Sequence, residues 1–198
     1  MNDEEYLEEI SYYVSYNIEA IRNFLYDKNT LDRVLALSYE MSECIKGGGS
    51  IVVFGNGGSA ADAQHFVAEL VGKFNMERKP ISAHCLNDNA SIITAISNDY
   101  TYSEVFARQV EAYAKQNDVV FIGISTSGKS LNVINALVKA NEGRSITAML
   151  SGENCPDYSF VEFMIKVKSK DTSIIQNAHI IILHIIAMIV EKEIFGTG

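Results

Sequence analysis

The sequence is short of basic side chains. Its 198 residues include 16 lysines and arginines against 25 aspartates and glutamates, which gives a formal net charge of −9 at pH 7. Proteins that coat nucleic acids normally carry a basic surface, so we expect no nucleic-acid partner. A small anionic substrate is still compatible with this balance, because a glycine turn and a helix N-terminus supply positive potential locally.

Cysteines, a basic leader and long hydrophobic runs are also scarce or absent. Cys44, Cys85 and Cys155 are widely spaced and form no C-x-x-C pair, which predicts reduced, packed thiols in a cytoplasmic protein. The first residues are acidic, so we expect no secretory signal peptide. The longest apolar run, Ile180–Val190, contains His184 and is well short of the ~20 residues that span a bilayer. We therefore predict no membrane partner and a buried helix here, apolar enough to pack against another subunit.

No linker, repeat or low-complexity segment divides the sequence, so we predict a single domain over residues 1–198. Apolar positions at helical spacing predict two helices within 1–46. From residue 50 onward, β-rich runs alternate with helical segments, which is typical of an α/β fold with a parallel sheet covered on both faces. Ligands are then expected beyond the carboxyl ends of the strands. Strands are predicted at 51–54, 81–86, 119–125, 146–150 and 163–167, and helices at 59–73, 89–97, 102–115, 130–142 and 172–194.

A glycine turn joins the first predicted strand to a helix. Gly55-Asn56-Gly57-Gly58-Ser59 directly follows the apolar run 50–54. Glycines allow close backbone approach, and the N–H groups of a first helical turn bind anions. His65 and Glu69 follow four residues apart, so they project from one helix face. Alone, this pair also fits an ordinary ion pair on a solvated face; beside an anion-binding turn, it favours catalysis over binding alone.

A second loop imitates a nucleotide-binding motif. Gly123–Ser130 fits the pattern G-x-x-x-x-G-K-[ST] between a strand and a helix, which would place Lys129 on phosphates and Ser130 on magnesium. The residues between its glycines are an isoleucine and three hydroxyl side chains, and no later strand ends in the Asp that would anchor magnesium. We therefore disfavour nucleotide hydrolysis. A hydroxyl-rich loop at a helix start equally suits the phosphate of a sugar.

Together the two loops resemble the sugar isomerase (SIS) family, and more closely its phosphoheptose isomerases. The resemblance covers nearly the whole chain. Lys129 departs from it, because the family commonly has Asn there, and Asn177 stands where Glu is usual. The residues that carry the resemblance are, in order, Gly55–His65, Ala68–Leu70, Asn98-Asp99, Ile124–Gly128, Thr172, Gln176 and His184.

The resemblance implies a three-layer α/β fold with a five-stranded parallel sheet (core 50–198) after an N-terminal helical segment (1–46). It implies a homotetramer with active sites shared between subunits, and conversion of sedoheptulose 7-phosphate to D-glycero-D-manno-heptose 7-phosphate. One zinc ion per subunit is implied on residues matching His65, Glu69, Gln176 and His184. Sugar-phosphate contacts are implied for Asn56, Gly57, Gly58, Ser59, Glu69, Asn98, Asp99, Ser125, Thr126, Ser127, Ser130 and Gln176.

An aldose–ketose isomerisation moves a proton between C1 and C2 through an enediol. It needs a base at carbon, a proton donor and acceptor for the oxygens, and stabilisation of the developing enediolate. Glu69 is the candidate carbon base, and His184 the candidate proton shuttle between the oxygens. A zinc ion would polarise the carbonyl, but glutamine is an uncommon zinc ligand and a metal-bound Glu69 is a poorer base. Whether the metal drives the chemistry or organises the site is left open.

Two alternatives accompany this interpretation. The SIS family also contains a non-catalytic tetramer that binds a replication initiator protein, and that relative lacks the acid and the histidine at the positions of Glu69 and His184. The other alternative keeps the isomerase mechanism and changes the sugar phosphate, because the sequence does not measure the depth of the pocket. We interpret His179 as structural, and expect Tyr100 and Tyr102 to be the tyrosines closest to the active site.

Overall fold

The structure, a computed structural model, describes residues 2–113 and 118–196. At its centre is a five-stranded parallel sheet with the strand order β2-β1-β3-β4-β5. The order reverses between β1 and β3, and a crevice for ligands is expected at such a switch point. The strands are β1 (Ser50–Gly55), β2 (Ala83–Cys85), β3 (Val119–Ser125), β4 (Ile146–Gly152) and β5 (Phe163–Val167).

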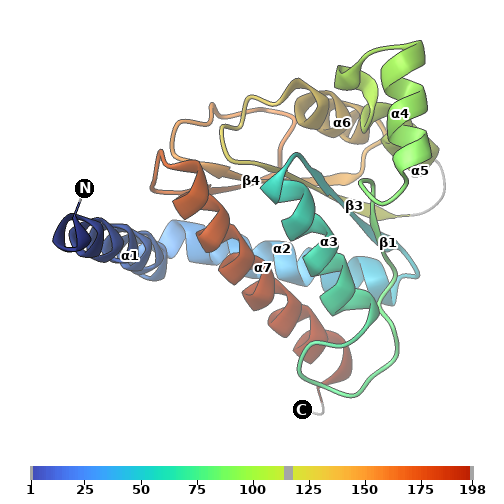
Figure 1. The fold of residues 1–198 in the computed structure, drawn as a ribbon. Helices are drawn as coiled ribbons and strands as arrows, with labels where there is room; N and C mark the ends of the chain where they lie inside the picture. Colours follow the sequence, from blue (N-terminus) through green and yellow to red (C-terminus); the bar gives the residue numbers. More distant parts are fainter. Residues whose placement is uncertain (1, 114–117, 197–198) are drawn as a thin grey trace.

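Helices cover both faces of the sheet, which explains why its strands are mostly apolar. On one face lie α2 (Lys28–Lys46), α3 (Gly58–Val71) and α7 (Thr172–Phe195), with α3 and α7 side by side (Figure 1). The opposite face carries α4 (Ala90–Asp99), the short 3-10 helix η1 (Tyr102–Glu104), α5 (Ala107–Tyr113) and α6 (Leu131–Glu142). This arrangement confirms the predicted three-layer α/β architecture.

The first helix, α1 (Asp3–Tyr26), reaches away from the rest of the chain (Figure 1). Only Ala20 and Phe24 of this helix are buried. Near its middle it touches α7, where the Asn177 amide donates to the Tyr13 hydroxyl at 3.1 Å and to the Asn17 side chain at 2.8 Å. Most of the surface of α1 is therefore left uncovered by its own chain.

The predicted continuous helix over 102–115 is wrong in the part that the structure describes. The chain forms η1, turns at Val105 and Phe106, and enters α5 only at Ala107. Val105 and Phe106 are fully buried in the core beneath α6, and Phe106 lies against Phe54. The helix is interrupted at this point because a turn buries both side chains. Residues 114 and 115 lie outside the described residues.

The apolar part of α7 extends beyond the predicted apolar run Ile180–Val190. Its 24 residues meet the length and composition of a membrane-spanning helix, with a mean hydropathy of 2.0 in the most apolar window. The expectation that the apolar segment is too short was therefore wrong as a matter of length. Half of that window is buried inside the chain, packed against α2 and α3, as in the core helix of a globular domain.

The three cysteines pack in the core, as predicted. Cys44, Cys85 and Cys155 are buried and form no disulfide. Burial raises the pKa of each thiol, that of Cys85 to about 12. Because the thiolate is the reactive form, these cysteines are inert packing residues near neutral pH.

His179 is a buried core residue on α7, in agreement with its structural interpretation. Its Nε2 lies 3.2 Å from the carbonyl oxygen of Ser151, and its Nδ1 is buried without a hydrogen-bond partner. Burial lowers the pKa of His179 to about 4. Since a histidine in the unfolded chain has a pKa near 6.5, the unfolded state binds the extra proton as the pH falls from 6.5 toward 4.

This linkage gives an expected pH dependence. The free energy of unfolding of the wild type should fall as the pH is lowered from 7 to 4.5. The variant His179→Gln keeps a donor for the Ser151 carbonyl but does not titrate, so its free energy of unfolding should fall by about 2 kcal/mol less over the same interval. Urea unfolding at fixed protein concentration measures both changes. A difference between the two proteins that is the same at pH 7 and pH 4.5 would contradict the assignment.

Candidate active site

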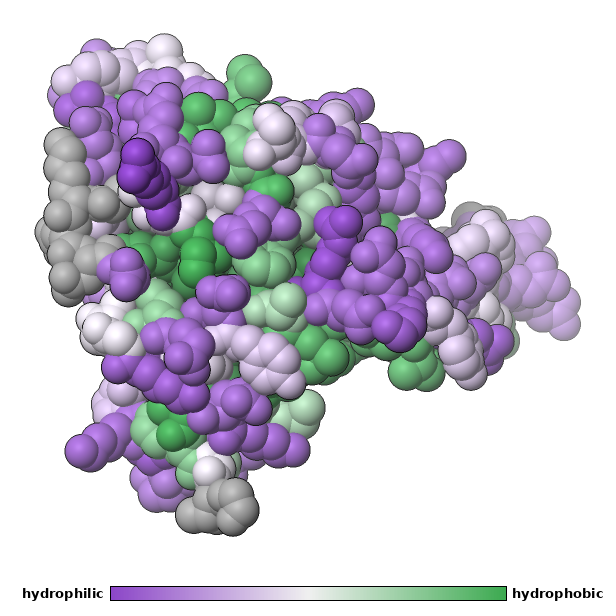
Figure 2. All heavy atoms as spheres, turned by 180° about the vertical axis from the view of Figure 1, so that it is seen from behind, coloured by the Kyte–Doolittle hydropathy of each residue, from purple (hydrophilic) through white to green (hydrophobic). Residues whose placement is uncertain are grey.

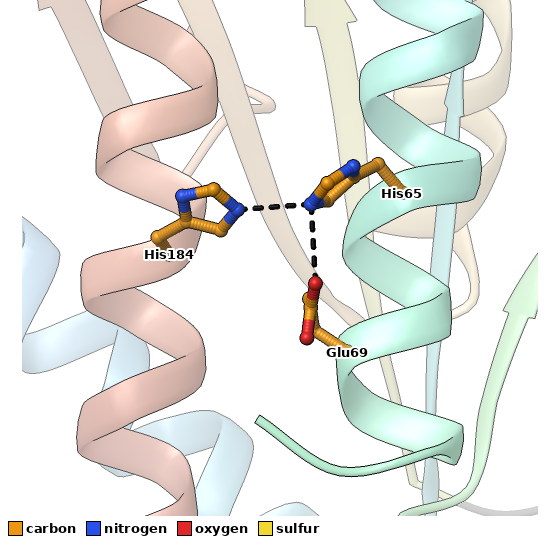
Figure 3. A group of neighbouring side chains, drawn as sticks. All are labelled: His65, Glu69 and His184. Carbon is orange, nitrogen blue, oxygen red and sulfur yellow. Dashed lines mark hydrogen bonds and ion pairs between the residues drawn. The ribbon is translucent and has the colours of Figure 1, made fainter. Parts of the chain in front are cut away.

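Facing side chains of α3 and α7 form a compact cluster (Figure 3). His65 Nε2 lies 3.1 Å from Glu69 Oε1 on the same helix and 2.9 Å from His184 Nε2 on the neighbouring one. The donor atoms of all three residues lie within 4.8 Å of one another. The four-residue spacing thus places His65 and Glu69 on one face, and the packing of α3 on α7 brings His184 to them.

The cluster is partly open. The side chains of His65 and Glu69 are 48% and 24% exposed, so a small solute can reach them. On the other side, the ring of Phe74 stacks on His184 with a centroid separation of 5.5 Å and an interplanar angle of 25°. Two imidazole nitrogens and a carboxylate oxygen that converge in this way are a common donor set for zinc.

Asp62 is a neighbour of this cluster to which the sequence analysis gave no role. It precedes His65 by three residues on α3, and its Oδ2 atom is buried without a hydrogen-bond partner. Burial raises the pKa of Asp62 to about 6, against the opposing effect of His65. Its spacing from His65 and Glu69 was the available signal, because positions 62, 65 and 69 share a helix face.

Gln176 lies about 12 Å along α7 from His184, eight residues away. Its amide packs against the start of α3, where a Cβ added to Gly58 would come 2.5 Å from Gln176 Nε2. A side chain at position 58 would push the flexible Gln176 amide out of this place. The structure therefore brings three of the four predicted metal ligands together, and places Gln176 beside the glycine turn.

The loops after β1 and β3 meet at the switch point, because these strands are neighbours in the sheet. The amides of Asn56 and Asn132 exchange hydrogen bonds of 2.8 and 2.9 Å across the gap. The Tyr102 hydroxyl also donates to Asn56 Oδ1, at 2.8 Å. Tyr102 was expected near the site, whereas the buried Asn132 was missed; a polar residue on the apolar side of a helix was its only signal.

The two helices that begin at these loops lack side-chain caps. Asn2, Asp27, Asn89 and Asp171 cap α1, α2, α4 and α7, whereas no side chain caps α3 or α6. The first-turn N–H groups of Ser59, Ala60 and Val133 already donate to backbone oxygens of the preceding loops. Those of Gly58 in α3 and Leu131 in α6 have no side-chain cap and can bind an anion. Two helix N-termini thus offer donors on either side of the switch point.

The loop after β3 is rich in hydroxyl groups. Ser125 Oγ donates to Ser130 Oγ at 3.1 Å, and Ser127 Oγ accepts from the backbone N–H of Lys129 at 3.1 Å. Gly128 turns the loop with φ of +66°, in the left-handed region, and packs on Cys155. A cavity of about 180 Å³ adjoins the loop, and its polar lining is Thr126, Ser127, Lys129, Asn154, Ser169, Lys170 and Thr172.

Three further predicted contacts are Ser59, Asn98 and Asp99. Ser59 is buried in the first turn of α3. Asn98 and Asp99 lie at the exposed end of α4, where the Asn98 amide donates to the Asp99 carboxylate at 2.9 Å. Tyr100, which follows them, packs against the Arg108 guanidinium 4.1 Å from its ring centroid.

Comparison with known proteins agrees with this fold. The sequence profile of the SIS domain family matches residues 14–151. A phosphoheptose isomerase from Geobacter metallireducens is 46% identical over 170 residues, which are 85% of this chain and 89% of the relative. One from Clostridium acetobutylicum is 42% identical over 181 residues, with 91% and 92% covered.

Solved structures of phosphoheptose isomerases also superpose on this chain. A phosphoheptose isomerase from Francisella tularensis superposes with a TM-score of 0.85 at 29% identity, covering 94% of this chain and 98% of that one. The corresponding enzyme from Neisseria gonorrhoeae gives a TM-score of 0.84 at 31% identity, with the same coverage. The chain therefore belongs to the phosphoheptose isomerase family of SIS-domain enzymes. The resemblance inferred from its sequence is confirmed.

Proposed function

We propose that this chain converts sedoheptulose 7-phosphate to D-glycero-D-manno-heptose 7-phosphate through an enediol. The observation that carries the proposal is that Glu69, on the helix that begins at the glycine turn, meets His184 on the neighbouring helix α7. Seven residues separate Gly58 from His65, about 10 Å along α3. This separation suits an extended sugar phosphate with its phosphate at the turn and its C1 and C2 atoms at the cluster.

The residues divide the proton transfers between them. Glu69 removes a proton from C1 of the ketose and returns it to C2, while His184 donates a proton to O2 and accepts one from O1. The uncapped starts of α3 and α6, together with Ser125, Thr126, Ser127 and Ser130, bind the phosphate. Asn56, Gly57, Gly58, Ser59, Asn98, Asp99 and Gln176 complete the proposed sugar-phosphate contacts.

We propose that His65, Glu69 and His184 hold one zinc ion per subunit, because their donor atoms already converge. When bound, zinc would polarise the substrate carbonyl as a Lewis acid. Gln176 was predicted as a fourth ligand as well as a sugar contact. Its place beside Gly58 supports the sugar contact more directly.

We also propose a homotetramer whose subunits share active sites. The helix α1 exposes apolar and aromatic side chains that its own chain does not cover, and large uncovered apolar surfaces mark protein interfaces. Figure 2 shows this helix from behind, projecting to the right of the body. Its exposed side chains include Tyr6, Leu7, Ile10, Tyr12, Tyr13, Val14, Tyr16, Ile18, Leu25 and Tyr26.

Sedimentation tests the assembly. We expect a species of about four times the 21.9 kDa chain mass at micromolar concentration. A monomer at that concentration would contradict both the tetramer and the shared sites.

An isomerase assay tests the function. Purified protein is given sedoheptulose 7-phosphate after chelation and again after zinc is restored, and the aldoheptose 7-phosphate is followed directly. We expect turnover that is lost on chelation and returns with zinc. Turnover that is unchanged by chelation would support the proposed reaction and contradict a role for zinc in it. No turnover in either state would overturn the proposal in favour of another sugar phosphate or the non-catalytic regulator.

Lys129 should contribute to substrate affinity. It lines the cavity beside the hydroxyl loop together with Lys170, and a second positive charge strengthens the binding of a phosphate. We expect Lys129→Asn to raise KM several-fold with little change in kcat, and to weaken the salt dependence of KM. The matched control is Lys139→Asn, which removes an exposed lysine from the far end of α6, the helix that follows the loop. An unchanged KM in Lys129→Asn would dismiss this role.

A further inference from the structure

A buried ion pair lies outside the proposed proton-transfer residues but close to them. Arg78 Nε lies 3.0 Å from Glu191 Oε1, and the two side chains are only 2% and 1% exposed. Arg78 comes from the loop 72–80 that leaves α3, and Glu191 from the last turns of α7. The pair therefore joins the C-terminal ends of the two helices that carry the candidate active site.

Glu191 anchors the loop by its backbone. Its Oε1 accepts from the N–H of Phe74 at 3.1 Å, and its Oε2 accepts from those of Asn75 at 2.8 Å and Met76 at 3.0 Å. Three successive N–H groups around one carboxylate form an anion-binding nest. Burial favours a neutral Glu191, but these hydrogen bonds and Arg78 outweigh it and lower its pKa, so the group stays charged.

Arg78 closes the end of α3. Its Nη2 donates to the carbonyl oxygen of Glu69 at 2.8 Å, and its Nη1 to those of Leu70, Gly72 and Lys79 at 2.8, 3.2 and 3.1 Å. The last carbonyls of a helix have no partner within the helix. Arg78 supplies these partners at the turn from which the Glu69 side chain projects.

The anchored loop carries Phe74, whose ring stacks on His184. Glu191 follows His184 by seven residues, so the two lie on one face of α7. The same carboxylate that binds the Phe74 N–H thus fixes the Phe74 ring relative to the helix face that presents His184. A buried ion pair is a costly way to join two helices if stability is the only gain, since apolar side chains often serve as well.

We propose that Arg78 and Glu191 are positioning residues: they hold the loop 72–80 so that Phe74 packs on the His184 imidazole and keeps it aimed at His65 and Glu69. The consequence for turnover rests on the proposed isomerase function. The consequence for the orientation of His184 does not, so the two are measured separately.

The first measurement is NMR of protein with labelled histidine. The four histidines give four sets of ring signals, and the His184→Gln spectrum identifies those of His184. A stacked Phe74 ring shields the His184 ring protons, so Phe74→Leu, and Glu191→Gln, which releases the loop, should each shift these signals downfield. The matched control, Phe163→Leu, removes a partly buried phenylalanine of the same core cluster on β5 and should leave them in place. Unmoved His184 signals in Phe74→Leu would overturn the proposal.

The second measurement is kinetic. We expect Phe74→Leu and Glu191→Gln each to lower kcat by roughly tenfold to a hundredfold, because small misplacement of a reacting group has effects of this size, with KM changed less than about twofold. Phe163→Leu should keep the wild-type kcat even if it lowers the melting temperature as much as Phe74→Leu does. Equal kcat values in Phe74→Leu and Phe163→Leu would overturn the proposal.

A double variant tests whether the two residues act together. If Glu191 acts through Phe74, the double variant Phe74→Leu/Glu191→Gln should have about the same kcat as whichever single variant has the lower kcat. Fully multiplicative losses would show independent roles and overturn the proposed link. A wild-type protein without isomerase activity would refute the proposed function, and the NMR shifts would still decide the positioning of His184.

Discussion

Glu69→Gln is expected to lower kcat by roughly a thousandfold, within the range that removal of a general base produces. The amide has nearly the shape of the carboxylate and keeps one oxygen for His65, which lies 3.1 Å away, so the fold should be retained. It cannot accept the C1 proton, and the enediol step loses its base. KM should change little, because the phosphate subsite lies about 16 Å along α3 from Glu69.

His184→Gln should cause a loss of similar size, since protons can no longer be passed between O1 and O2. It also removes one of the three converging metal donors, so the zinc content of the purified protein should fall as well. The controls are Glu142→Gln, an exposed surface carboxylate paired with Lys139, and His84→Gln, an exposed histidine on β2. Both should behave as wild type.

The double variant Glu69→Gln/His184→Gln should be little worse than either single one, because residues that act as a unit lose their effect together. Steady-state assays of the four proteins measure this directly. Wild-type activity in the double variant would refute the proposed roles of both residues and leave the cluster as a structural contact.

Local patterns were enough to predict much of the fold. The strands β3 and β5 occur at their predicted residues, because each is a short, mostly apolar run, interrupted in β5 only by Lys166. The break before α5 was not predictable in this way. Val105 and Phe106 suit a helix by their spacing, and only the space beneath α6 shows that burying both requires a turn.

The candidate site was likewise predictable from local patterns only in part. The shared face of His65 and Glu69 follows from their spacing alone, because four residues make about one helical turn. His184 is 119 residues away from His65, and its place opposite them depends on the packing of α3 against α7. Before that packing was known, only the family resemblance indicated His184.

The buried pair shows what a sequence conceals. Arg78 lies in a polar loop and Glu191 near the end of a helix beside Lys192 and Glu193, where charged side chains are ordinarily solvated. Their contact joins positions 113 residues apart. Sequence patterns do not indicate that both charges are removed from water, because burial is decided by the folded loop.

This burial makes Arg78→Ala the substitution with the largest expected effect on stability. Loss of the guanidinium leaves the Glu191 carboxylate, 1% exposed, without its charged partner, and unpaired buried charges typically cost about 3–5 kcal/mol. It also removes the donors to the carbonyls of Glu69 and Leu70 at the end of α3. Urea unfolding at one protein concentration measures the loss, since assembly would otherwise shift the midpoint.

The same loop supplies the control. Lys73 pairs with Glu77 at 2.6 Å, but both side chains are mostly exposed, at 60% and 85%. Exposed pairs contribute little to stability, so Lys73→Ala should hardly move the unfolding midpoint. The double variant Arg78→Met/Glu191→Leu should be destabilised by less than the sum of its single variants, because each single variant strands a charge that the double one removes. A midpoint for Arg78→Ala as close to wild type as that of Lys73→Ala would mean that water reaches Glu191 when the loop loses its arginine. In that case the nest of N–H groups around the carboxylate, and not the ion pair, would be what holds the loop against His184.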